Sequence, residues 1–172
     1  KLYSTDIVEL PIKQDIIKIL KKKVDFQFYK VIPDSTLPFH NEFFDLIIHH
    51  DVIEHTRKPY FMIKEQFRTL KKGGVLFFST PNLLRPTNLI KSIIGHLKFP
   101  QKIGSNLEIG DYIHEKEFYM EDLRILVEEF DFSEVEIYSK LFGLIPLQMF
   151  YDYKEDFRWK ENGHLLFCRA VK

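Results

Sequence analysis

The fold of this chain is decided by residues 43–80, "FFDLIIHHDVIEHTRKPYFMIKEQFRTLKKGGVLFFST". The stretch begins as a continuous apolar run and passes through a group of ionisable side chains. Apolar residues then recur at helical spacing, and a second apolar run follows a pair of glycines. Continuous apolar runs of this length predict strands that are covered on both faces. The stretch therefore predicts a strand, helix and strand in succession, as in an α/β protein.

The segments on either side continue the same alternation of strand and helix patterns. Before the central stretch, residues 2–8 and 26–32 predict strands, and residues 11–23 predict a helix that opens at Pro11. After it, the expected elements are helices over 87–97 and 119–130 and strands over 132–140 and 163–171. This order predicts one domain over residues 1–172, an α/β fold with a mostly parallel sheet and antiparallel strands at its C-terminal edge.

Composition narrows the classes of function. The 172 residues carry 25 Lys and Arg and 25 Asp and Glu, so no net charge favours a nucleic acid or an anionic membrane. The single cysteine cannot form an intrachain disulfide, which suits a reducing compartment. No apolar stretch approaches the roughly 18 residues that span a bilayer. We therefore expect a cytoplasmic protein with no nucleic-acid partner and no membrane span.

Polar residues follow each predicted parallel strand, at its carboxyl end. In open α/β sheets ligands bind beyond these ends. The residues in question are Asp6 after the first strand, Asp34 and Ser35 after the second, the group from His49 to His55 after the third, and Thr80 and Asn82 after the fourth. They predict one cleft.

Residues 37–82 resemble the second half of class I S-adenosylmethionine-dependent methyltransferases. The resemblance is carried by a Leu-Pro-Phe element, "FDLI", the acidic turn "VIEH", a helix ending in "LKKGG" and a strand ending in "TPN". Residues 114–137, "HEKEFYMEDLRILVEEFDFSEVEI", are similar to a later segment of the family. The resemblance implies a Rossmann-like fold, S-adenosylmethionine as cofactor and methyl transfer, with O-methylation of a small-molecule or sugar-linked acceptor as the expected reaction.

The chain departs from the family at its start. Members carry a glycine-rich loop after their first strand, whereas the earliest glycine here is Gly73. We therefore expect the N-terminal strand and its loop to be missing from this chain, leaving an empty place between residues 2–8 and 44–50. The alternative is a non-catalytic, methyltransferase-like scaffold or interaction domain that has lost cofactor binding.

The resemblance assigns cofactor contacts to the first three strand ends. Asp6 would accept hydrogen bonds from the two ribose hydroxyls, because each carboxylate oxygen can meet one donor. The full set of expected cofactor residues is Asp6, Ile7, Asp34, Ser35, His49 and His50. Helix capping by Asp6 and an ordinary turn at Asp34 and Ser35 remain alternatives.

Asp51, Glu54 and His55 are the candidate catalytic residues. If the turn is helical, their spacing places all three on one face, where two acids would raise the pKa of the imidazole and orient it as a general base. Asn82 and His114 are candidate substrate residues. Packing of His55 in the turn is an alternative, and so is a divalent ion held by Asp51, Glu54, His55 and His114, a set similar to that of small-RNA 2′-O-methyltransferases. The interpretation adopted has no metal.

Two further segments fall where the family inserts a substrate-recognising cover, over residues 83–112 and 141–160. Their aromatic residues suit the stacking of a sugar or ring and suit a small core or homodimer contact equally well.

Overall fold

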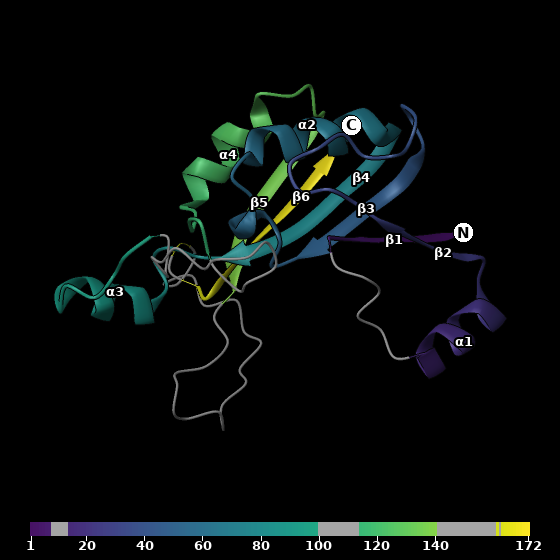
Figure 1. Cartoon of the computed structure of the whole chain (residues 1–172). Helices are drawn as coiled ribbons and strands as arrows, with labels where there is room; N and C mark the ends of the chain where they lie inside the picture. Colours follow the sequence, from purple (N-terminus) through teal and green to yellow (C-terminus); the bar gives the residue numbers. More distant parts are fainter. Residues whose placement is uncertain (8–13, 100–113, 141–160, 162) are drawn as a thin grey trace.

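The computed structural model describes residues 1–7, 14–99, 114–140, 161 and 163–172 (Figure 1). Two sheets are present in this part. Strands β1 (Leu2–Asp6) and β2 (Phe26–Lys30) form the smaller sheet, and β3 (Phe44–His50), β4 (Leu70–Pro81), β6 (Leu165–Val171) and β5 (Glu134–Lys140) form the larger one in that order. The helices are α1 (Gln14–Lys23), the 3-10 helix η1 (Ile53–His55), α2 (Pro59–Thr69), α3 (Pro86–Ile93) and α4 (Met120–Glu128).

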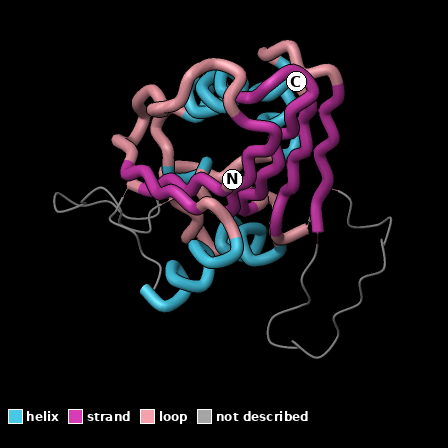
Figure 2. Tube along the Cα trace, turned by 90° about the vertical axis from the view of Figure 1, so that its right-hand side faces the viewer, coloured by secondary structure: helices cyan, strands magenta, loops and turns pink. Residues whose placement is uncertain are grey.

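The strand directions confirm the predicted fold class. β1 runs parallel to β2 and β3 runs parallel to β4, whereas β6 is antiparallel to both of its neighbours. In Figure 2 the strands of the larger sheet lie side by side next to the C-terminus. β6 occupies an interior position although it comes last along the chain.

The hydrophobic core lies between one face of the larger sheet and helices α2 and α4, which lie together above that sheet in Figure 1. Alternate residues of β4 and β6 point into it, as a strand's period of two requires. The fully buried members include Leu76 and Phe78 of β4, Leu166 and Cys168 of β6, and Ile63 of α2. Cys168 is a core residue, and its burial raises the pKa of the thiol to about 12.

The opposite face of β3 corrects one expectation. The apolar run predicted a strand covered on both faces, but the residues Leu46 and Ile48 are 51% and 64% exposed. The reason is positional, because within the described residues β3 pairs only with β4 and is an edge strand of the larger sheet. A sheet edge presents backbone groups that another strand can pair with.

Aromatic rings join the smaller sheet to the larger one. Tyr3 of β1 lies 5.0 Å from Phe43 and 5.7 Å from Phe44, measured between ring centroids. Phe39 is buried at the centre of the group, 4.8 Å from Phe44 and 5.0 Å from Tyr29 of β2. These edge-to-face contacts hold β1 and β2 beside β3, although none of the described backbone groups pair β1 with β3.

The loop that carries Phe39 is fixed to α2 by an ion pair. Arg68 and Glu65 of α2 lie 2.7 Å apart. Arg68 also donates hydrogen bonds to the backbone oxygens of Leu37 and Phe39, and Glu65 accepts one from the backbone nitrogen of Leu37.

No helix in the described part of the chain is long and apolar enough to cross a membrane.

Candidate functional site

The carboxyl ends of β1, β2, β3 and β4 come together, as the sequence predicts. The backbone nitrogen of Val31, after β2, donates to the oxygen of Asp6 at the end of β1. The hydroxyl of Thr56, after η1, donates to Oδ1 of Asp34. The backbone nitrogen of Asp51 donates to the oxygen of Ser79 in β4 at 3.1 Å. These bonds link the end of β1, the loop after β2, the turn after β3 and the C-terminal part of β4 into one rim.

The expected cofactor residues of the first two strands lie on this rim. Asp6 and Ile7 end β1 and are half-buried, and Asp34 and Ser35 form the half-buried turn after β2. Asp34 adopts a φ of 53°, in the left-handed region that aspartate tolerates better than most residues. Its hydrogen bond to Thr56 places the acid beside the turn after β3.

The two histidines at the end of β3 face in different directions. His49 stacks on Phe78 at 4.8 Å between ring centroids, and burial lowers its pKa to about 4. Its side chain therefore belongs to the core side of the sheet. His50 is exposed, with Nδ1 hydrogen-bonded to the Ser79 hydroxyl and Nε2 3.0 Å from Asp51 Oδ2.

The turn after β3 departs from the helical face that the spacing predicts. η1 spans only Ile53–His55, and Asp51 lies outside it with a φ of 50°. Because the turn is too short for α-helical spacing to apply, Asp51 does not share a helical face with Glu54 and His55. Its exposed carboxylate pairs with His50 instead.

Glu54 is the most enclosed acid of the turn, with no exposed surface. Oε2 accepts a hydrogen bond of 2.9 Å from the Thr80 hydroxyl, and Oε1 lies 3.9 Å from Nε2 of His55. Burial raises the pKa of the Glu54 carboxyl, and the negative charge of Asp51 acts in the same direction.

His114 is brought beside His55 from a distant part of the chain. Their ring centroids are 5.0 Å apart, and the backbone nitrogen of Glu115 is bonded to the oxygen of Glu54. The structure thus unites Glu54 and His55, two of the three candidate catalytic residues, with the candidate substrate residue His114.

A buried polar network that sequence reasoning missed lies behind His114. Glu117 has no exposed side-chain surface and lies 2.7 Å from His114 Nδ1, 2.6 Å from Arg85 Nη2 and 2.5 Å from Asn88 Nδ2. Burial opposes ionisation of Glu117, but the bond to His114 and the charge of Arg85 outweigh it and lower its pKa. The three-residue spacing of His114 and Glu117 was the available signal, whereas Arg85 and Asn88 lie far away in sequence.

Asn82 occupies a structural position. It is fully buried, and its amide nitrogen donates to the backbone oxygens of Glu161 and Gly163 while its oxygen accepts from the nitrogen of Leu84. Because these bonds use both ends of its amide, Asn82 holds the segment after β4 against residues 161 and 163.

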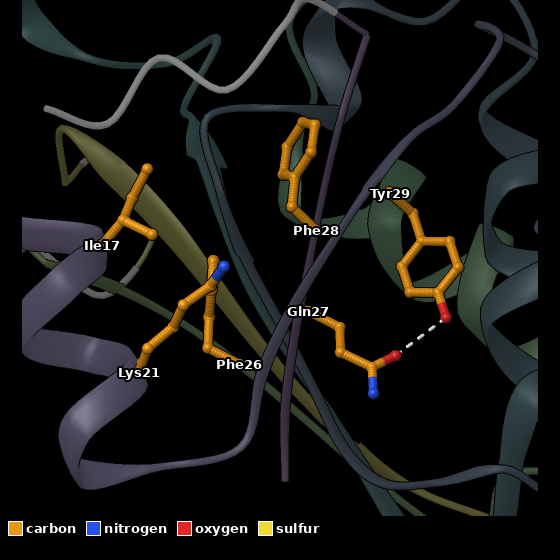
Figure 3. A pocket seen from close by; sticks show the side chains of 6 residues that line it. All are labelled: Ile17, Lys21, Phe26, Gln27, Phe28 and Tyr29. Carbon is orange, nitrogen blue, oxygen red and sulfur yellow. Dashed lines mark hydrogen bonds between the residues drawn. The ribbon is translucent and has the colours of Figure 1, made fainter. Parts of the chain in front are cut away.

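A separate hollow of about 400 Å³ lies between α1 and β2 (Figure 3). It is lined by Ile17, Lys21, Phe26, Gln27, Phe28 and Tyr29. These residues do not include any of the acids and histidines of the rim, so the hollow and the candidate site are distinct places.

Comparisons with known proteins find similar sequences and folds. The family described as methyltransferase domain matches residues 1–78. A ubiquinone biosynthesis O-methyltransferase of Shewanella sp. (strain ANA-3) is 25% identical over 130 residues, which are 76% of this chain and 53% of that protein. The chain thus spans about half the length of this curated relative.

Solved structures show the same fold. A methyltransferase of Thermotoga maritima, described as S-adenosylmethionine-dependent and a possible histamine N-methyltransferase, has a TM-score of 0.64 at 20% identity, covering 99% of this chain and 72% of its own. An S-adenosylmethionine-dependent methyltransferase of Archaeoglobus fulgidus has a TM-score of 0.62 at 17% identity, with coverages of 99% and 75%.

The fold is thus the Rossmann-like fold of S-adenosylmethionine-dependent methyltransferases. Residues 1–78 match the methyltransferase domain family, and the fold of the chain is that of the S-adenosylmethionine-dependent methyltransferases that the sequence resembles. S-adenosylmethionine is the cofactor of this class.

Proposed function

We propose that this chain takes part in S-adenosylmethionine-dependent methyl transfer to a hydroxyl group of a small-molecule or sugar-linked acceptor. The observation that carries the proposal is the hydrogen bond between Thr56 and Asp34, which joins the loop after β2 to the turn after β3. This bond brings Asp34, a candidate ligand of the cofactor's nucleoside, close to His55, the candidate base for the methyl acceptor. Both lie at the carboxyl ends of the strands, where ligands bind in this kind of fold.

The cofactor would be held by the rim residues of the first three strands. Asp6 would accept hydrogen bonds from the ribose hydroxyls, Ile7 would cover the adenine, and Asp34 and Ser35 would meet the edge of the base. At the end of β3 the backbone of His49 and His50 would border the methionine portion. The methyl group of a sulfonium is already activated, so the protein mainly supplies position and exclusion of water.

The glycine-rich loop remains part of this proposal as a further strand and loop between β1 and β3. Aromatic rings hold β1 and β3 side by side, which supports this placement. Among the described strands β1 pairs only with β2 and β3 only with β4, so the edges that β1 and β3 turn toward each other are unpaired. One parallel strand in that place would pair both edges and cover the cofactor.

His55, supported by Glu54, is the group we propose to take up the acceptor's proton. The His55 side chain is partly exposed, so it could contact the acceptor as a general base. The buried Glu54 carboxylate lies 3.9 Å from it and could orient the imidazole. Asp51, whose exposed carboxylate pairs with His50, would lie outside this pair. Oxygen as the acceptor atom is supported by the relative named an O-methyltransferase, whereas the Thermotoga protein is described with N-methylation.

Isothermal titration of the full-length protein, with the proposed strand and glycine-rich loop, against S-adenosylmethionine tests the proposal. We expect one site, with Asp6→Ala binding about 10-fold or more weaker because a charge-assisted hydrogen bond is lost. Asp131→Ala is the matched control, since Asp131 is exposed near the start of β5, at the other end of the sheet. His55→Ala should retain cofactor affinity and lose methyl transfer, measured as S-adenosylhomocysteine released with a panel of small hydroxyl acceptors.

The absence of binding at millimolar cofactor, in a protein whose circular dichroism shows it folded, would overturn the proposal. That result would favour the second candidate, a non-catalytic interaction domain. Unchanged methyl transfer in His55→Ala would exclude His55 as the base while leaving the cofactor site intact.

A further inference from the structure

Three potential metal ligands meet at the turn after β3. Glu54, His55 and His114 each offer one ligand atom, and these atoms all lie within 4.8 Å of one another. Two ligands bound at about 2.0 to 2.2 Å from one zinc ion lie at most about 4.4 Å apart, so these atoms need to approach one another by only a few tenths of an ångström to bind a common ion. Glu54 and His55 come from η1, and His114 approaches from the segment before α4.

The buried carboxylate of Glu54 is only half satisfied. Thr80 bonds to Oε2, but within the described residues no donor lies within hydrogen-bond distance of Oε1. Burying a charged oxygen without a partner is costly. Oε1 is also the oxygen that lies 3.9 Å from Nε2 of His55, so its open side adjoins the imidazole. A cation between them would supply the missing partner.

The histidine opposite is oriented as a metal ligand would be. Because a carboxylate accepts hydrogen bonds, the 2.7 Å contact to Glu117 places a proton on Nδ1 of His114 and leaves Nε2 with a free lone pair. Histidine ligands of metals commonly donate their other ring nitrogen to a carboxylate in this way. Arg85 and Asn88 fix Glu117 from behind.

From this geometry we propose that Glu54, His55 and His114 bind one divalent transition-metal ion such as Zn²⁺. Two imidazoles and one carboxylate form a ligand set of catalytic zinc sites, which keep a further position open. Mg²⁺ and Ca²⁺ are disfavoured because they prefer oxygen ligands. The His55 and His114 side chains are 29% and 21% exposed, so a ligand from solvent can reach the ion. Asp51 is outside the set because it pairs with His50.

The role of the ion rests on the proposed methyl transfer, whereas its binding does not. An acceptor hydroxyl at the open position would lose its proton more readily, since a bound cation lowers the pKa of its oxygen ligand. In the ion-loaded protein His55 is a ligand, so the proton of the acceptor hydroxyl passes to solvent water instead of to His55.

Binding is tested without any acceptor, using chelator-treated protein and Co²⁺ as a coloured probe, with Zn²⁺ in parallel calorimetry. We expect one ion per chain and visible absorption bands of low-coordinate Co²⁺, displaced by Zn²⁺. Glu54→Gln, His55→Ala and His114→Ala should each weaken binding about 100-fold, and Glu117→Gln about 10- to 100-fold by freeing the His114 ring. His96→Ala, at an exposed histidine beyond α3, should bind as the parent does.

The inference would be overturned if the protein does not bind one equivalent of Co²⁺ or Zn²⁺ with a Kd below about 10 μM. Metal binding that is unchanged in His55→Ala and His114→Ala would also overturn it, because the ions would then occupy adventitious surface sites. If Glu54→Gln fails to fold, the two histidine variants decide. Titration of the same chelator-treated protein with S-adenosylmethionine keeps the proposals apart. Cofactor binding without metal binding removes only the metal site, and metal binding without cofactor binding removes only the methyl transfer.

Discussion

The ring of Tyr3 lies 5.7 Å from the ring of Phe44 at an angle of 73°, and this contact joins β1 to β3 across two separate sheets. Aromatic ring contacts therefore hold β1 beside β3, whereas backbone hydrogen bonds hold the paired strands within each sheet together. Since Asp6 is on the smaller sheet and His55 follows β3, the aromatic group also sets the position of the two halves of the candidate site.

The first prediction concerns Phe39, which contacts both sheets. Phe39→Ala should lower the free energy of unfolding by about 3 to 5 kcal/mol, because a buried ring is lost and a cavity remains. Phe39→Leu keeps most of the apolar contact and should cost about 1.5 kcal/mol or less. Urea denaturation followed by circular dichroism measures both. Equal losses in the two variants would contradict a role that depends on filling this space.

The second prediction concerns pH and His49. This histidine titrates near 6.5 in the unfolded chain and at about 4 in the folded protein, where burial disfavours its charge. Between these values the unfolded chain binds a proton that the folded protein does not, so stability falls as the pH falls from about 6.5 to 4. The loss attributable to His49 is at most roughly 3 kcal/mol.

His49→Phe should preserve the stacking on Phe78 and remove this part of the pH dependence. The measurement is the free energy of unfolding of parent and variant at several pH values across that window. His96→Phe, which alters an exposed histidine, should leave the slope of the parent unchanged. A His49→Phe protein with the parent's slope would show that His49 is not the titrating group.

The third prediction concerns Gly74 in β4. A Cβ atom there would lie 2.8 Å from the backbone oxygen of Lys71 and 3.1 Å from that of Phe44. Backbone atoms cannot move aside as a flexible side chain can. Gly74→Ala should therefore lower the free energy of unfolding by about 1 to 3 kcal/mol, and with it the melting temperature. At Gly95, which has a φ of 71°, no atom would meet the new methyl group, and only the backbone strain of about 1 kcal/mol is expected. A smaller effect at Gly74 than at Gly95 would refute the steric account.

The elements of the fold were predictable because strand and helix periods are local. Residues 43–80 form a strand, helix and strand, and helix α4 and strands β5 and β6 lie where the apolar patterns predict them. The exposure of Ile48 was not predictable, because an apolar run indicates burial without saying which neighbours are present. The 3-10 turn also escaped prediction, since three residues carry no periodic signal, and this changed the position assigned to Asp51.

The candidate site was predictable only in part, because local sequence patterns do not show which distant residues come into contact. His55 and Glu54 adjoin each other in sequence, and the strand ends indicate where they lie. Glu117 is an ordinary glutamate in sequence, and its importance comes from burial beside Arg85, 32 residues away, and Asn88, 29 residues away. Such contacts depend on how the loop after β4 meets the start of α4, which no local pattern specifies.

The interior place of β6 has a consequence for synthesis on the ribosome. β5 is made earlier, yet it joins the larger sheet only through β6, which separates it from β4. Until residues 165–171 have left the exit tunnel, a nascent chain must therefore keep β5 unpaired with the rest of the sheet. During that interval β5 presents unpaired backbone groups to which a strand of another chain could add.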